Sequence, residues 1–139
     1  WLGTTAESQR WAERRIEPLA NVDAAVRFLS CEPLLSAIDL TPWLSRNLIG
    51  WVIAGGESGA HARPTHPNWI RSLRDQCERF GVPFHFKQWG HWAPQGEILP
   101  NRRTIEVKDD NGDAVQLTWR PKGVSGRRID GRTWDGLPL

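Results

Sequence analysis

The sequence predicts an α/β fold: a partial, or half, parallel β/α barrel followed by a small C-terminal β-hairpin. Short apolar runs alternate with helical patterns over residues 1–92, as expected for parallel strands joined by crossover helices. Glu7, Glu32 and Glu57 follow three of these runs and lie 25 residues apart each time, which indicates an internal repeat. The alternation then stops, and two strand-like segments within 104–119 flank an Asn-Gly turn, which predicts the hairpin.

Each predicted strand is a short apolar run that ends in polar residues or glycine. The clearest run is Trp51–Ala54, which is followed by Gly55 and Gly56 and then by Glu57 and Ser58. Because the carboxyl ends of parallel strands meet at one edge of a sheet, we expect the polar residues to form a single rim. The four strands are expected at residues 1–6, 24–31, 49–54 and 82–89.

Helical patterns occupy the connections between these strands. Ser8 is the expected N-cap of a helix that runs to about Leu19. An apolar stripe over Trp69–Phe80, closed by Gly81, predicts the longest helix. The connection at 34–44 is apolar but contains a proline, so we expect a short helix or an irregular crossover there.

Length and composition fit one modest domain. The chain has 139 residues, of which 39% are hydrophobic and 24% are charged. We divide it into a βα half-barrel at 1–92 and a hairpin with a basic tail at 93–139, in the same domain or loosely docked. Cys31 and Cys77 lack the spacing of metal ligands and are expected to be buried thiols.

Two features of the sequence bear on location and completeness. No apolar run approaches the roughly 18 residues of a membrane-spanning helix, and no secretion signal opens the chain, so we expect no membrane partner and a cytoplasmic location. The sequence contains no methionine and begins directly in a strand-like segment. We therefore expect a fragment or truncated product of a longer protein.

The predicted rim offers carboxylates and amides that could bind a small nucleoside ligand. A glutamate there, with Glu57 as first choice, could accept hydrogen bonds from ribose hydroxyls or an amine. Alternatively, each glutamate caps a helix or pairs with Arg27, Arg63 or Lys87, and the glycines make only a tight turn. The candidate ligand-binding residues are Glu7, Ser8, Glu32, Gly55, Gly56, Glu57, Ser58, Arg63, Lys87, Gln88 and Trp89.

Three residue types near the rim have a functional and a structural interpretation. Arg63 could hold a phosphate or carboxylate through two hydrogen bonds, or it could simply be solvated in its long loop. Trp89 could stack on a base, but with nine tryptophans in the chain it could equally fill the core. The four histidines lack the spacing of known metal motifs, so we predict no metal site.

A basic tail suggests a second kind of ligand. The net charge of the whole chain is only +2, yet one segment near the C-terminus is rich in cations and could bind nucleic-acid phosphates. The alternative is an ordinary solvated segment. The candidate residues are Arg120, Lys122, Arg127, Arg128 and Arg132.

Six segments resemble a known family when they are taken in order. They are Trp1–Glu7, Arg27–Leu35, Trp51–Gly59, Ala62–Pro64, Trp69–Cys77 and Phe86–Gly90. Together they resemble the C-terminal half of the phage gene-product-37/68 family, an uncharacterised family that is similar to a divergent branch of the radical-SAM superfamily. The resemblance is dense over 1–92 and weaker over 126–135.

The resemblance implies a radical-SAM-like barrel of which this chain supplies the nucleoside- and substrate-binding half. Full-length relatives begin with a three-cysteine motif that would hold a [4Fe–4S] cluster and S-adenosylmethionine. This chain lacks that motif, so it is expected to hold no cofactor and to be inactive in radical chemistry by itself, and no catalytic residue is assigned. A missing N-terminal half or a second copy would cover the strand edge that a half-barrel exposes.

Two further hypotheses belong to other classes. The chain could be a non-catalytic nucleic-acid-binding protein of phage or prophage type that uses the basic tail. It could also be a truncated remnant of a gene that folds poorly.

Overall fold

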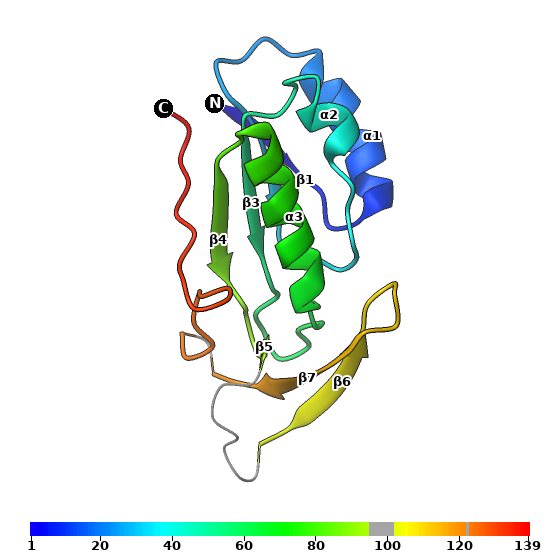
Figure 1. Ribbon diagram of the computed structural model, residues 1–139, viewed down its shortest axis with the longest axis vertical. Helices are drawn as coiled ribbons and strands as arrows, with labels where there is room; N and C mark the ends of the chain where they lie inside the picture. Colours follow the sequence, from blue (N-terminus) through cyan, green and yellow to red (C-terminus); the bar gives the residue numbers. More distant parts are fainter. Residues whose placement is uncertain (95–101, 122) are drawn as a thin grey trace.

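The computed structural model describes residues 1–94, 102–121 and 123–139 (Figure 1). Its larger sheet is parallel, and the strands follow one another in chain order, β1-β2-β3-β4. This confirms the four predicted strands. The described strands form an open sheet, so barrel closure stays a prediction. The strands are β1 (Leu2–Thr5), β2 (Arg27–Cys31), β3 (Trp51–Gly55) and β4 (Phe84–Gln88).

Helices pack on one face of this sheet and form the core with it. α1 (Gln9–Ala20) lies on β1, and α3 (Pro67–Phe80) lies on β3 and β4 with α2 (Thr41–Leu44) beside it (Figure 1). Side chains at alternate strand positions point into this layer, because successive residues of a strand face opposite sides. Leu29, Val52 and Phe86 are completely buried there.

The helix ends follow the predicted signals. Ser8 occupies the N-cap position of α1, although its side chain makes no capping hydrogen bond. Gly81 ends α3 in the left-handed conformation, with φ of 66°, which glycine adopts at little cost. Pro42 lies in the first turn of α2, where a proline is tolerated, and most of the 34–44 connection is irregular.

The opposite face of the parallel sheet is lined by aromatic rings. The Trp51 ring lies 5.6 Å from that of Phe28 and 6.2 Å from that of His85, measured between ring centroids. His85 and Lys87 alternate with the buried Phe84 and Phe86 along β4 and therefore lie on this face.

A second, antiparallel sheet follows, with strand order β5-β7-β6. The predicted hairpin is confirmed, and Gly112 in its turn has φ of 85°. The third strand was not predicted from the sequence. It begins at the proposed boundary between residues 92 and 93, and that division stays a prediction. The strands are β5 (Trp92–Pro94), β6 (Thr104–Lys108) and β7 (Ala114–Trp119).

The C-terminal tail docks along the outer edge of β4 (Figure 1). The Phe86 amide donates to the Trp134 carbonyl at 2.9 Å, and the Gly136 amide donates to the Phe84 carbonyl at the same distance. Ile129 anchors the tail in the core and is 1% exposed. Among the described strands, β1 pairs with β2 alone, so the sheet edge that stays open is that of β1.

Candidate functional site: the strand-end rim and the arginine cavity

The predicted rim exists at the carboxyl ends of the four parallel strands. Loops between the strands are tied to it by backbone hydrogen bonds: the Leu34 amide donates to the Gly55 carbonyl at 3.0 Å, and the Leu35 amide donates to the Glu7 carbonyl at 2.8 Å. Glu7, Glu32 and Glu57 all lie here, because each follows the carboxyl end of its strand by one or two residues and these ends meet at one edge. Each glutamate is half-buried and has its own cationic partner.

Glu57 is clamped by Arg63. The Arg63 amide and Nε donate to Glu57 Oε2 at 2.7 and 2.9 Å, and Nη2 donates to Oε1 at 2.8 Å. These hydrogen bonds favour the ionised carboxylate and lower the pKa of Glu57 from 4.5 to about 2. Both oxygens of Glu57 are therefore occupied, and Arg63 is one of the cations named in the alternative that each rim glutamate pairs with a basic side chain.

Glu32 lies at the centre of a second cluster. Lys87 Nζ lies 3.2 Å from its Oε1, and Gln88 Nε2 lies 3.5 Å from the same oxygen. Gln88 Nε2 also donates to Ser58 Oγ at 3.3 Å, so the ends of β2, β3 and β4 are joined through side chains. In the described parts of the chain, these contacts to Glu32 use Oε1, and Oε2 faces Gly55.

Glu7 forms the third pair, with a partner that the sequence did not reveal. Arg15 Nη1 lies 3.2 Å from Glu7 Oε2 and also donates to Thr5 Oγ1. The Arg15 guanidinium carbon lies 4.2 Å from the centroid of the Trp11 ring. A shallow cavity of about 330 Å³ opens beside this pair, lined by Glu7, Ser8, Trp11, Arg15, Pro33, Leu35 and Arg63. Only the placement of α1 over the end of β1 brings Arg15 here.

Close packing between strand ends explains the rim glycines. A Cβ on Gly56 would overlap the carbonyl group of Trp89, and a Cβ on Gly90 would overlap the backbone of Glu57. A Cβ on Gly55 would lie 3.3 Å from the carboxylate of Glu32. The close approach at Gly56 is thus to another strand end of the same protein.

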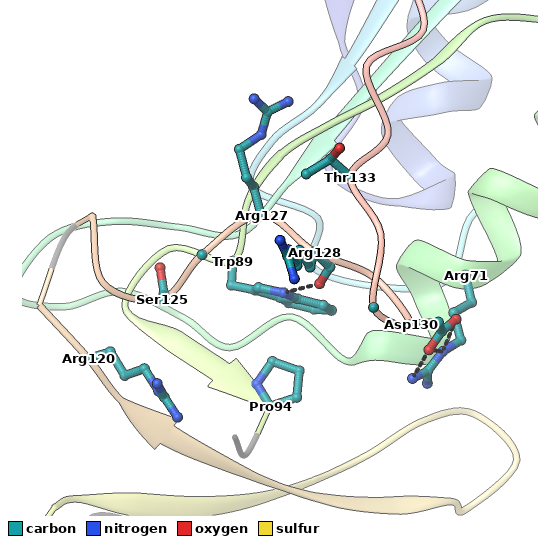
Figure 2. Close-up of a pocket in the computed structure, with 11 residues that line it drawn as sticks. Arg71, Trp89, Pro94, Arg120, Ser125, Arg127, Arg128, Asp130 and Thr133 are labelled. Carbon is teal, nitrogen blue, oxygen red and sulfur yellow. Dashed lines mark hydrogen bonds and ion pairs between the residues drawn. The ribbon is translucent and has the colours of Figure 1, made fainter. Parts of the chain in front are cut away.

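A second cavity, larger than the one beside Glu7, lies between the tail and the body of the protein, with Trp89 in its lining (Figure 2). We call it the arginine cavity; its volume is about 610 Å³. Trp89 is 5% exposed and packs edge-on against Phe86, so its ring faces are not open to a stacked base at the rim. The lining residues are Arg71, Trp89, Pro94, Arg120, Ser125, Gly126, Arg127, Arg128, Asp130, Gly131 and Thr133.

The predicted basic residues of the tail have different surroundings. Arg127 pairs with Asp135, and Arg132 lies over the Trp134 ring at 3.7 Å, so both help to hold the tail. Arg120 and Arg128 line the arginine cavity. Lys122 lies outside the described residues.

An ion-pair network that the sequence analysis missed closes one side of the arginine cavity. Asp130 accepts hydrogen bonds from Arg71 Nη2 at 2.8 Å and from Arg74 Nη1 at 2.8 Å. The two guanidinium groups lower the pKa of Asp130 from 3.8 to about 2. Asp130 has φ of 51°, a rare conformation for a residue other than glycine. The available signal was that Asp130 is the only acidic residue among the basic residues 120–132.

The cysteines do not suit the implied iron–sulfur cluster. Cys31 and Cys77 are the only cysteines of the chain, and both are buried free thiols, as predicted. Burial raises the pKa of Cys77 to about 12 and raises the pKa of Cys31 as well. A [4Fe–4S] cluster needs at least three thiolates, which two protonated buried thiols cannot supply.

Two further observations, on metal sites and on membrane-spanning helices, apply to the part of the chain that the structure describes. No group of three or more histidine, cysteine, aspartate or glutamate side chains is close enough to hold a metal ion. In that same part, no helix has the length and apolar character needed to cross a lipid bilayer.

Comparison with known proteins identifies the family but no activity. No curated protein and no solved structure is significantly similar to the chain. Residues 1–138 match the family described as "Protein of unknown function (DUF5131)". Because the match covers almost the whole sequence, the chain belongs to this uncharacterised family, DUF5131.

Proposed function

We propose that this chain is the nucleoside- and substrate-binding half of a radical-SAM-like enzyme, related to the phage gene-product-37/68 family. The observation that carries the proposal is the rim. Four parallel strands in chain order bring Glu7, Glu32, Glu57 and Gln88 to one edge. Polar side chains at the carboxyl ends of parallel strands are where α/β proteins commonly bind ligands.

Glu32 is the rim carboxylate best placed to accept hydrogen bonds from a ligand. Arg63 occupies both oxygens of Glu57, so a ligand would first have to displace a well-aligned guanidinium. The described contacts to Glu32 use only Oε1, and its position directly after β2 puts it between the other two glutamates. The chemistry that Glu32 suits is recognition of hydroxyl or amino groups of a nucleoside.

Radical chemistry would require cysteine ligands that this chain does not contain. Another segment or another chain would have to supply them. The open edge of β1 is where an additional strand could pair, either from such a segment or from a second copy. In this proposal the chain binds and orients the nucleoside, and a cluster held by the other segment or chain would supply the electron.

Titration calorimetry with S-adenosylmethionine tests the proposal. We expect saturable binding that Glu32→Gln weakens about tenfold or more, because a hydrogen bond to a charged group contributes about 1.5–3 kcal/mol. Glu106→Gln, on β6 away from the rim, removes the same charge and should leave the affinity unchanged. The proposal fails if no saturable binding occurs, or if both variants bind as the wild type does.

A second candidate is a nucleic-acid-binding protein without catalytic activity. The arginine cavity favours it, since the described residues that line this cavity include four arginines and a single carboxylate. Binding of this kind weakens steeply as salt is added. It would persist in Glu32→Gln and be lost when Arg127 and Arg128 are both replaced by alanine.

A further inference from the structure

The arginine cavity carries an excess of positive charge that the tail does not need for docking. Among the described residues, its lining includes Arg71, Arg120, Arg127 and Arg128 but only one carboxylate, that of Asp130. Asp130 is already engaged by Arg71 and by Arg74. Arg127 pairs with Asp135, which lies outside the lining. Arg120 and Arg128 therefore face the cavity without a carboxylate partner among the described residues.

Arg120 and Arg128 approach the cavity from different elements. Arg120 follows β7, and its Nε is buried without a hydrogen-bond partner among the described residues. Arg128 belongs to the tail; its carbonyl accepts a hydrogen bond from Trp89 Nε1 at 2.9 Å, and its side chain is exposed. Figure 2 shows Arg120 on one side of the Trp89 indole and Arg128 close beside that ring. A buried, unpaired guanidinium N–H is costly unless an acceptor pairs with it, and a phosphate oxygen is an acceptor that also matches its charge.

A smaller cavity adjoins the arginine cavity on the side of the rim. Its volume is about 200 Å³, and Lys87 and Gln88 of β4 line it on the rim side. Ser125, Gly126 and Arg127 line both cavities. Lys87 and Gln88 are the residues that contact Glu32. A ligand with one part at Glu32 could thus extend past Lys87 toward Arg128.

We propose that the substrate of the rim is phosphorylated, a nucleotide or a nucleic-acid strand, and that its phosphate binds in the arginine cavity between Arg120 and Arg128. This inference rests on the proposed function, and it names the substrate class. Guanidinium groups bind phosphate oxygens through paired hydrogen bonds. The volume of about 610 Å³ lies within the range of about 300–1,000 Å³ found for small-molecule sites.

Three probes, titrated into the 139-residue chain, distinguish binding of phosphate alone, of a free nucleotide and of a nucleic-acid strand. Inorganic pyrophosphate probes the arginine cavity alone. Adenosine diphosphate probes a free nucleotide, and a single-stranded DNA of about six nucleotides probes a strand. Arg128→Ala is the test variant, because its exposed side chain can be removed while the carbonyl bonded to Trp89 stays. Arg10→Ala, on α1, removes the same charge from another exposed arginine and is the matched control.

We expect the probes to bind and Arg128→Ala to weaken each about tenfold, while Arg10→Ala has no effect. For the DNA, the slope of log affinity against log salt should become shallower by about 0.7 in Arg128→Ala, the value for one lost phosphate contact of a single strand. Tighter binding of the DNA than of the diphosphate identifies a strand as the substrate, and the reverse identifies a free nucleotide. Circular dichroism of Arg128→Ala should match that of the wild type.

The proposal is overturned if the phosphorylated probes do not bind, or if Arg128→Ala and Arg10→Ala weaken them equally. Its failure is distinguishable from that of the proposed function. If S-adenosylmethionine does not bind but pyrophosphate binding depends on Arg128, the nucleoside site at the rim is ruled out and the phosphate site in the arginine cavity is supported. If S-adenosylmethionine binding depends on Glu32 but no probe depends on Arg128, only the phosphate site falls.

Discussion

At the scale of single residues, the ion pair between Glu57 and Arg63 links stability to pH. Arg63 donates to both oxygens of the Glu57 carboxylate. Its pKa is about 2 in the folded protein, against an ordinary value of 4.5. A lowered pKa means that the folded state binds the proton less readily than the unfolded chain does, so the carboxylate stabilises the fold when ionised.

We predict that Glu57→Gln destabilises the protein at neutral pH and that this deficit shrinks in acid. The contribution of Glu57 is fully present above pH 4.5 and is lost as the pH falls through about 2. Urea unfolding of wild type and variant at pH 7, 4 and 2.5 measures it. Asp130 titrates in an overlapping range, so the difference between the two proteins, rather than the wild-type curve, is the quantity to follow.

Arg63→Gln is the matched partner variant for this experiment. It removes the guanidinium that lowers the pKa of Glu57, so it should reproduce the same pH dependence, and the double variant should add little. A deficit of Glu57→Gln that stays constant from pH 7 to 2.5 would contradict the assignment.

At the scale of elements, the start of α3 depends on a histidine that connects the two sheets. His66 is the N-cap: the Asn68 amide donates to its Nδ1 at 3.1 Å. The proton is therefore on Nε2, which lies 3.0 Å from the Asp113 carbonyl and donates to it. One 2% exposed side chain thus starts a helix and holds the turn between β6 and β7 against it.

His66→Ala should lower the stability by about 1 kcal/mol or more, the usual cost of losing an N-cap, with the hairpin contact in addition. Thermal unfolding followed by circular dichroism measures this as a lower Tm. His61→Ala is the control, since His61 is exposed in the same loop. His66→Asn should recover part of the loss, because asparagine is a strong N-cap. Equal effects of His66→Ala and His61→Ala would rule out the capping role.

At the scale of the whole molecule, the tail acts as an additional edge element. It pairs with the outer edge of β4 through the bridge between His85 and Asp135, and Ile129 is buried beneath it. Trp51 Nε1 donates to the Gly136 carbonyl at 2.8 Å, which fixes the tail beyond the edge of the sheet. The arginine cavity exists only while this docking holds, because the tail forms one of its walls.

Ile129→Ala should therefore release the tail. Truncating a fully buried isoleucine to alanine costs about 2–5 kcal/mol. Here that cost lowers the free energy with which the tail docks on the body of the protein. We expect trypsin to cleave after Arg127, Arg128 and Arg132 much faster than in the wild type, as read by mass spectrometry over time. Val124→Ala is the control, since Val124 is 57% exposed. Unchanged cleavage in Ile129→Ala would show that the tail is held by other contacts.

Local patterns in the sequence determined most of the elements of this protein. Apolar runs ending in polar residues located the four parallel strands, the stripe from Trp69 to Phe80 located α3, and the Asn-Gly turn located the hairpin. Each of these signals lies within a few residues of the structure that it specifies, since periodicity and turn chemistry are local properties. The placement of Glu7, Glu32 and Glu57 at one rim also followed from the sequence, because the repeat fixes their positions at strand ends.

Only the tertiary structure decided what those side chains contact. β5 is three residues long and exists because β7 offers it an edge. The pairing of Glu7 with Arg15 and of Glu32 with Lys87 depends on how α1 and β4 lie against β1 and β2. The arginine cavity joins residues from α3, β7 and the tail, which lie far apart in the sequence. Contacts between residues far apart in the sequence depend on how the helices and strands pack together, so no local sequence pattern predicts them.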